Sequence, residues 1–228
     1  LNNIGHIIQN RQVMLYYYNR SCEGDTVCAK VCHRIGIDHP LAIGVCTRKD
    51  YIVGLTGNEH DRVAVERGTD GELRVASLGC GPAREVSDYV ACRQSWPCPA
   101  VFTLIDQEEE ALGVAYRACK REIGLKDVPV GLDLLNLSFF QMMTEGVPLH
   151  EPESQDFVYC TGLFDYIKTR RAQSLIGALY DLLAPGGLMS IGNAKTPQEC
   201  WWTAEFLGDW TMIDRTRDEV MELAATLP

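Results

Sequence analysis

The chain has 228 residues, a net charge of -10 and a hydrophobic fraction of 46%. Together with a mean hydropathy of -0.09, these values are typical of a soluble globular protein and exclude a disordered chain, a collagen-like repeat and a coiled coil. The acidic balance argues against general nucleic-acid binding, because phosphate backbones carry the same charge. No apolar run approaches the roughly 18 residues that cross a bilayer. We therefore predict a cytoplasmic protein with no stable membrane insertion.

The ten cysteines are many for a cytoplasmic protein, and we interpret them mainly as reduced thiols. The spacing of Cys22, Cys28 and Cys32 contains no CxxC pair, so we predict no metal site there. A surface disulfide between Cys92 and Cys98 stays open. Three further cysteines have apolar neighbours and are predicted to lie in the core: Cys80, Cys119 and Cys160.

The first seventy residues are predicted to be helical. Helices are expected over residues 4–19, 27–35 and 40–55, with three tyrosines at positions 16 to 18 of the first. We expect residues 1–70 to cap the open end of the following domain as a lid. An inert layer that only adds to the core explains the pattern equally well.

From Leu73 onward, apolar runs that predict strands alternate with stretches that predict helices. The predicted strands cover residues 73–78, 101–105, 128–137, 156–160 and 188–191. The predicted helices begin at Arg84 or cover residues 108–123, 172–183 and 218–227. Five strands that alternate with helices favour parallel crossovers and an α/β fold with a doubly wound, mainly parallel sheet, helices on both faces and the N-terminal helical cap. We assign this domain to residues 71–228. Such a sheet often has two more strands, so we expect that the domain is truncated at its C-terminus and, since the chain begins at Leu1, that its N-terminus is trimmed.

Two features mark a ligand crevice at the carboxyl ends of the strands. Gly79 and Gly81 lie in a turn between a strand and a helix, where the backbone can approach a ligand closely. Asp106 ends the next strand, where a carboxylate can accept both hydroxyls of a ribose. A glycine turn followed by an acid is shared by cofactors that contain a nucleoside, NAD included. Arg84 stands where a dinucleotide site would need its third glycine, which argues against NAD.

Four segments resemble, in order and spacing, the motifs of class I S-adenosylmethionine-dependent methyltransferases. They are residues 77–85 (SLGCGPARE), 104–107 (LIDQ), 156–166 and 183–187 (LAPGG). The resemblance covers roughly residues 73 to 195 and implies a Rossmann-like fold with S-adenosyl-L-methionine as cofactor. The strings SLGCGPARE, GLFDYI and LLAPGGLMSIGN also resemble a bacterial subgroup described as fatty-acid methyl ester biosynthesis proteins, for example for 3-hydroxypalmitic acid.

The resemblance implies a set of cofactor-binding residues. It places the backbone of residues 79–81 against the methionine part of the cofactor, Asp106 on the ribose and Gln107 beside the adenine. Asn136 and Leu137 would flank the adenine, with Asp133 as the alternative if the third strand ends earlier. Residues 160–162 would form the floor beneath the sulfonium. The implied set is Gly79, Cys80, Gly81, Pro82, Glu85, Asp106, Gln107, Asn136, Leu137, Thr161 and Gly162.

Four residues beyond the fourth and fifth strands are candidates for catalysis: Asp165, Tyr166, Asn193 and Arg215. Asp165 and Tyr166 would orient the acceptor, although a helix cap and core packing explain them as well. Asn193 would bind the acceptor or stabilise a turn. Arg215 would pair with a substrate carboxylate or form a salt bridge to a nearby acid. A group of aromatic residues is a candidate wall for an acyl pocket or packs in the core: Trp201, Trp202, Phe206 and Trp210.

The sequence therefore predicts an S-adenosylmethionine-dependent methyltransferase that acts on a small apolar carboxylic acid or hydroxylated metabolite. The alternatives are a non-catalytic cofactor-binding sensor or scaffold and a methyltransferase for protein side chains. The expected partner is a small-molecule acceptor, with neither nucleic acid nor metal, and homodimerisation stays open.

Overall fold

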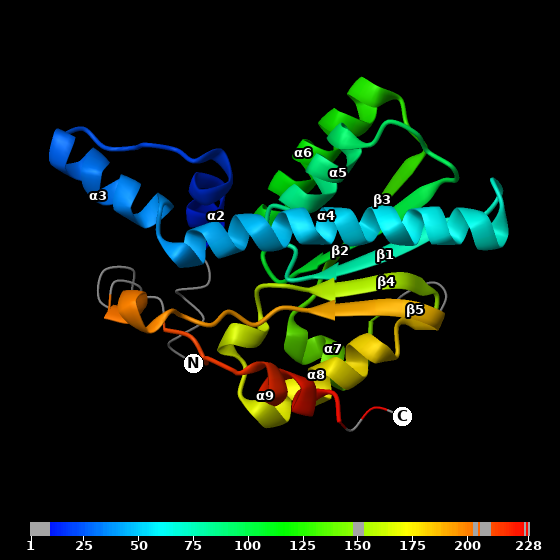
Figure 1. Ribbon diagram of the computed structural model, residues 1–228. Coiled ribbons are helices and arrows are strands. Elements are labelled where there is room, and N and C mark those ends of the chain that lie inside the picture. Colours follow the sequence, from blue (N-terminus) through cyan, green and yellow to red (C-terminus); the bar gives the residue numbers. More distant parts are fainter. Residues whose placement is uncertain (1–9, 148–152, 203–204, 206–210, 226, 228) are drawn as a thin grey trace.

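The computed structural model describes residues 10–147, 153–202, 205, 211–225 and 227 (Figure 1). Its centre is a sheet of five parallel strands in the order β3-β2-β1-β4-β5. The strands are β1 (Leu73–Leu78), β2 (Ala100–Asp106), β3 (Val130–Asn136), β4 (Gln155–Cys160) and β5 (Leu183–Ile191). The chain order reverses between β1 and β4, and ligands bind in such sheets at the carboxyl ends beside this point. The predicted doubly wound α/β fold is confirmed.

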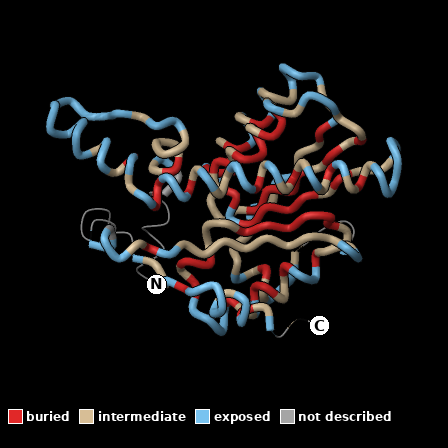
Figure 2. Tube along the Cα trace, in the orientation of Figure 1, coloured by how far each residue is buried: buried red, intermediate tan, exposed pale blue. Residues whose placement is uncertain are grey.

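Helices cover both faces of the sheet (Figure 1). One face packs against α4 (Pro40–Arg67), α5 (Arg84–Cys92) and α6 (Glu109–Lys126). The other packs against α7 (Phe139–Glu145), α8 (Thr169–Tyr180) and α9 (Arg217–Leu223). Helices α2 (Asn10–Asn19) and α3 (Val27–Ile37) lie at the N-terminal end of α4. Most of α3 is exposed, whereas burial is concentrated in the strands and the inner faces of the other helices (Figure 2).

Strand β1 shows how the sequence builds two cores. Its residues alternate between the two faces, as the pleat of a strand requires. Leu73 and Val75 join the core under α4, α5 and α6, whereas Ala76 and Leu78 join the core above α8. Because both faces are buried, the strand is apolar almost throughout, as is usual in parallel sheets.

Several predicted helix ends are wrong, because tertiary packing overrides local stop signals. Helix α4 continues past Leu55 to Arg67, although it contains three glycines, since its second half keeps a buried face against the sheet. Helix α6 likewise passes Gly124 and ends at Lys126, followed by Asp127 as its cap, whose φ of 51° is left-handed. The helix predicted over 218–227 spans only Arg217–Leu223. Of the helix predicted over 4–19, residues 4–9 lie outside the described residues.

The predicted turn at residues 184–187 lies inside a strand. Gln155 pairs with Leu183 and Phe157 with Leu188, so these residues form an irregularity in the ladder between β4 and β5. A Cβ on Gly187 would lie 2.9 Å from the carbonyl oxygen of Gln155, which explains the glycine at this close approach. The helix predicted over 172–183 ends earlier, at Tyr180.

The cysteine predictions have mixed outcomes. The predicted core thiols Cys80, Cys119 and Cys160 are buried. A disulfide between Cys92 and Cys98 is contradicted, because Cys92 is exposed, Cys98 is buried and both are free. Among the described residues, no group of three or more His, Cys, Asp or Glu could hold a metal ion. Nor does any helix in the described ranges have the length and apolar character that would let it cross a membrane.

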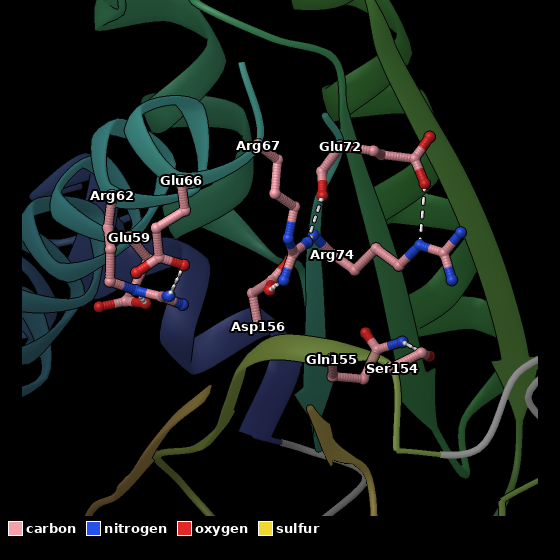
Figure 3. Close-up of polar contacts among 9 residues, drawn as sticks. All are labelled: Glu59, Arg62, Glu66, Arg67, Glu72, Arg74, Ser154, Gln155 and Asp156. Atoms are coloured by element: carbon pink, nitrogen blue, oxygen red, sulfur yellow. Dashed lines mark hydrogen bonds and ion pairs between the residues drawn. The ribbon is translucent and has the colours of Figure 1, made fainter. Parts of the chain in front are cut away.

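The amino ends of the strands, opposite the ligand edge, are tied together by ionic contacts (Figure 3). Asp156 is fully buried at the start of β4 and receives hydrogen bonds of 2.5 and 3.1 Å from Arg67, at the end of α4. The backbone N–H of Arg74 on β1 also donates to this carboxylate, at 2.9 Å. One buried carboxylate therefore joins α4, β1 and β4.

A second buried polar contact fixes α4 on the sheet. His60 is fully buried; its Nδ1 lies 2.6 Å from the hydroxyl of Tyr89 and its Nε2 lies 2.9 Å from the carbonyl oxygen of Cys98. A carbonyl only accepts, so Nε2 carries the proton and Nδ1 accepts from Tyr89. Burial lowers the pKa of His60 below its ordinary value.

This lowered pKa predicts a loss of stability in mild acid. The unfolded chain binds a proton at His60 below about pH 6.5, where the folded chain resists it, so the free energy of unfolding falls as the pH drops from about 6.5 towards the folded pKa. One such group contributes at most about 1.4 kcal/mol per pH unit. Urea unfolding between pH 7.5 and 5.5 should show a smaller slope for His60→Gln than for the unsubstituted chain. Equal slopes would contradict the prediction.

Candidate functional site

A cavity of about 420 Å³ opens at the carboxyl ends of the strands. Residues that follow all five strands line it, and helices α2 and α4, with single residues of α5, α6 and α7, complete the wall. The volume lies in the range of small-molecule sites, which is about 300 to 1,000 Å³. The cavity is therefore at the edge that the sheet topology favours for a ligand.

The turn after β1 needs its glycines. Gly79 and Gly81 have φ of 62° and 52°, and Ala83 has the same left-handed sign at 45°. A Cβ on Gly81 would meet nothing within 4 Å, so the side chain is excluded by the backbone conformation rather than by crowding. The N–H groups of Gly79 and Cys80 point to the carbonyl oxygen of Ile105, at 2.8 and 3.2 Å. The turn thus folds over the end of β2.

Asp106 lies beside this turn and helps to shape it. One carboxylate oxygen accepts from the N–H of Gly81 at 2.8 Å, and the other accepts from the N–H of Glu108 at 3.0 Å. Each oxygen of a carboxylate has two lone pairs, so each can accept a further hydrogen bond from a ligand. The backbone carbonyl of Asp106 receives the amide of Asn136 at 3.1 Å, which joins β3 to the same corner.

Glu85 is a buried acid in the cavity wall. It lies in the first turn of α5 and accepts a hydrogen bond of 3.0 Å from the hydroxyl of Tyr159, on β4. Burial raises the pKa of Glu85 above its ordinary value, and it raises the pKa of Tyr159 as well. The wall under the glycine turn therefore contains a carboxyl group that a cationic ligand group would stabilise in its charged form.

The loops after β4 and β5 are tied to each other. Asp165 is buried and accepts from the N–H of Ala194, while its own carbonyl oxygen accepts from Ile213 at 2.7 Å. Burial raises the pKa of the Asp165 carboxyl. The amide of Asn193 donates to the carbonyl oxygens of Ala194 and Ile213 at 2.9 and 3.0 Å. These contacts hold the far side of the cavity in shape.

Arg215 stabilises this arrangement from outside the cavity. It is buried and donates to the carbonyl oxygens of Phe164 and Ile167 at 2.7 and 2.5 Å and to Oδ1 of Asn193 at 2.6 Å. Three protein acceptors thus occupy the guanidinium, which does not line the cavity. The loop after β4, the segment after β5 and the chain before α9 are joined at this one side chain.

Most residues predicted for the site meet at the cavity. The predicted residues that line it are Gly79, Cys80, Gly81, Pro82, Glu85, Asp106, Gln107, Leu137, Thr161, Gly162, Asp165, Tyr166 and Asn193. Asn136 and Arg215 lie behind this lining. Asp133 lies three residues before the end of β3 and is exposed. Trp201 and Trp202 are 52% and 56% exposed and also lie outside the lining, and Phe206 and Trp210 fall outside the described residues.

The cap contributes residues that the sequence did not single out. Leu41, Gly44, Val45 and Arg48 lie on α4 and line the cavity, and their spacing of three and four residues places them on one helical face. Met14 and one of the three tyrosines, Tyr18, join them from α2. The signal that could have found Arg48 is its place on an otherwise apolar face. His39 caps α4 by accepting from the N–H of Leu41 at 3.2 Å.

Comparison with known proteins identifies relatives through structure alone. No protein-family model matches the chain, and no curated protein matches it in sequence. Magnesium protoporphyrin IX methyltransferase (ChlM) from Synechocystis PCC 6803, crystallised with bound SAH, is similar with a TM-score of 0.55 and 12% identity over 95% of this chain and 81% of its own. The S-adenosylmethionine-dependent methyltransferase SibL is similar with a TM-score of 0.50 and 15% identity, over 96% of this chain and 65% of SibL. LepI in complex with SAM has a TM-score of 0.50 and 15% identity, over 75% of this chain and 40% of LepI.

The chain thus spans less than two thirds of the length of SibL and of LepI. At these identities, the likeness establishes the architecture and leaves the chemistry to the residues of the cavity. The chain has the Rossmann-like α/β fold that ChlM and SibL share.

Proposed function

We propose that this chain is an S-adenosylmethionine-dependent methyltransferase whose acceptor is a small apolar carboxylic acid or hydroxylated metabolite. One observation carries the proposal: the glycine turn after β1, Asp106 after β2 and the loops after β4 and β5 line a single cavity. A cofactor held at the first two therefore has room for an acceptor at the last two. The folds of ChlM and SibL agree with this proposal.

The residues present fit the cofactor. The further lone pairs of Asp106 suit the two ribose hydroxyls, and the open space at Gly81 suits the close approach of a ligand. Glu85 supplies negative charge for the ammonium group of the methionine part. Gln107 and Leu137 line the same cavity on the side of β2 and β3, where the adenine would lie. When bound, S-adenosylmethionine supplies a methyl group on a sulfonium sulfur.

The chain's part in the transfer is mainly alignment of the acceptor. Methyl transfer from a sulfonium is an in-line displacement, and correct orientation can supply much of the acceleration. Asp165 and Tyr166 would orient the acceptor beside Thr161 and Gly162. Asn193 and Arg215 act as positioning residues, because their hydrogen bonds hold the loops that carry this wall. A carboxylate acceptor needs no general base, whereas a hydroxyl would need one, and Asp165 is the acid placed for that role.

The cavity favours a small acceptor over a protein side chain or a long acyl chain. Its 420 Å³ must hold the cofactor as well as the acceptor, and α2 and α4 form one of its walls. Short 3-hydroxy fatty acids are therefore the first members of the fatty-acid class to test.

Calorimetric titration with S-adenosylhomocysteine tests the cofactor. We expect micromolar binding and no signal with NAD, because the turn lacks the third glycine of a dinucleotide site. Incubation with labelled S-adenosylmethionine and 3-hydroxy acids of four to sixteen carbons should then give a labelled product. A folded protein that does not bind S-adenosylhomocysteine would overturn the proposal.

Turnover measured apart from affinity separates an enzyme from a cofactor-binding sensor. Asp165→Asn should slow methyl transfer by at least about tenfold, because Asp165 would orient the acceptor, while the affinity for S-adenosylhomocysteine changes little. Asp181→Asn, at an exposed position after α8, is the matched control. Binding without transfer to any acceptor of the series would favour the sensor.

A further inference from the structure

Arg48 places a positive charge in the wall of the cavity. It belongs to the face of α4 that also carries Leu41 and Val45, and all three line the cavity. A Cβ on Gly162 would lie 3.3 Å from Nη2 of Arg48, so the guanidinium lies close against the backbone that follows β4. This position is on the acceptor side of the proposed site.

Within the described part of the chain, the guanidinium of Arg48 makes neither a hydrogen bond nor an ion pair. Two other partly buried arginines do form ion pairs. Arg62 pairs with Glu59 and Glu66, and Arg93 pairs with Asp61. Arginine has five N–H donors in a planar fork that matches a carboxylate. A partly buried fork without a protein partner, beside a cavity, is suited to an anionic ligand.

Two acids that interact electrostatically with Arg48 already accept hydrogen bonds from other groups of the chain. Glu85 and Asp165 both interact with it electrostatically. Glu85 accepts from the hydroxyl of Tyr159, and Asp165 accepts from the N–H of Ala194. Neither carboxylate forms a hydrogen bond with the guanidinium, so the fork stays open for a ligand within reach of the cavity.

Both cations that line the cavity lie on the acceptor side, whereas its acids lie on both sides. Asp106 and Glu108 follow β2, on the proposed ribose side. The cations are Arg48, next to the loop after β4, and Lys195, after β5. Glu85 and Asp165 also line the cavity, and each carboxylate already accepts a hydrogen bond from another group of the chain. The cap residues beside Arg48 are apolar, which fits a ligand with an anionic group and an apolar body.

We propose that Arg48 binds the carboxylate of the methyl acceptor, so that the substrate class is a small carboxylic acid with an apolar body. This inference rests on the proposed methyltransferase function and assigns to Arg48 a pairing that was one of two alternatives for Arg215 in the sequence analysis. The other carboxylate that can reach this cavity belongs to the methionine part of the cofactor. Both candidates are carboxylates. Replacing Arg48 distinguishes them, because only the ligand that Arg48 binds should lose affinity.

The test is calorimetric titration of the full chain, saturated with S-adenosylhomocysteine, using butanoate, octanoate and hexadecanoate, with methyl octanoate as the uncharged analogue. We expect at least one carboxylate to bind, and methyl octanoate to bind at least about tenfold more weakly than octanoate. Arg48→Met should weaken carboxylate binding by about tenfold or more, and Arg48→Lys by less. Arg117→Met, at an exposed position on α6, is the matched control.

The affinity for S-adenosylhomocysteine decides between the two carboxylates. The inference requires that Arg48→Met binds it within about threefold of the unsubstituted chain, because a lost hydrogen bond to a charged group costs more than that. An equal loss for S-adenosylhomocysteine and for the carboxylate would overturn it, as would a saturated chain that binds none of the carboxylates. An unsubstituted chain that fails to bind S-adenosylhomocysteine instead refutes the proposed function itself. Thermal unfolding of each variant checks that it is folded.

Discussion

Replacing Asp106 with alanine is expected to weaken the binding of S-adenosylhomocysteine by about two orders of magnitude. The carboxylate would lose two hydrogen bonds to ribose hydroxyls, each worth about 1.5 kcal/mol when one partner is charged. A loss of about 3 kcal/mol corresponds to roughly a hundredfold in the dissociation constant. The variant also releases the N–H groups of Gly81 and Glu108, which Asp106 now holds at 2.8 and 3.0 Å. Calorimetric titration measures the effect directly.

Two further variants separate ligand binding from the shape of the turn. Asp106→Asn keeps one carbonyl oxygen that can accept from Gly81, so its loss of affinity should be smaller than that of Asp106→Ala. Asp133→Ala removes an exposed acid from β3, outside the cavity, and should leave the affinity unchanged. If Asp106→Ala binds within about threefold of the unsubstituted chain, Asp106 does not hold the ribose.

The fold could be predicted because local signals and tertiary structure agree at the strands. Leu73–Leu78 and Gln155–Cys160 are short, mostly apolar segments that are buried on both faces, and polar or glycine residues lie at their ends or next to them in the sequence. Parallel strands joined by helices then restrict the topology to few choices. The glycine turn and Asp106 follow from the same logic, since both directly follow strands whose ends meet at one edge of the sheet.

The cap and the arginines could not be predicted in this way, because their roles depend on contacts between distant segments. Arg48 reaches Gly162, which lies 114 residues later in the sequence. The residues next to Arg48 and Arg215 in the sequence do not show that Arg215 donates to the carbonyl oxygens of Phe164 and Ile167 or that Arg48 lines the cavity. The packing of α4 over the strand ends determines that Arg48 lines the cavity.

The opposite edge of the sheet leads to the second large effect: Asp156→Ala should lower the free energy of unfolding by about 3 kcal/mol. Breaking a buried ion pair by removing one partner costs about 3 to 5 kcal/mol. The lower value applies because the side chain of Arg67 is 40% exposed and can be rehydrated, whereas Asp156 is fully buried. The N–H of Arg74 also loses its acceptor, which lies 2.9 Å away. Urea unfolding measures the change.

An exposed ion pair on the same helix provides the matched control. Glu66 pairs with Arg62 on α4, and its side chain is 51% exposed (Figure 3). Glu66→Ala should therefore cost no more than about 0.5 kcal/mol, as exposed pairs four residues apart usually do. Asp156 lies at the amino ends of the strands and outside the cavity lining, so the folded Asp156→Ala variant should bind S-adenosylhomocysteine as the unsubstituted chain does. A destabilisation no larger than that of Glu66→Ala would mean that Asp156 does not tie α4 and β1 to β4, and a loss of cofactor affinity in the folded variant would mean that the two edges of the sheet are coupled.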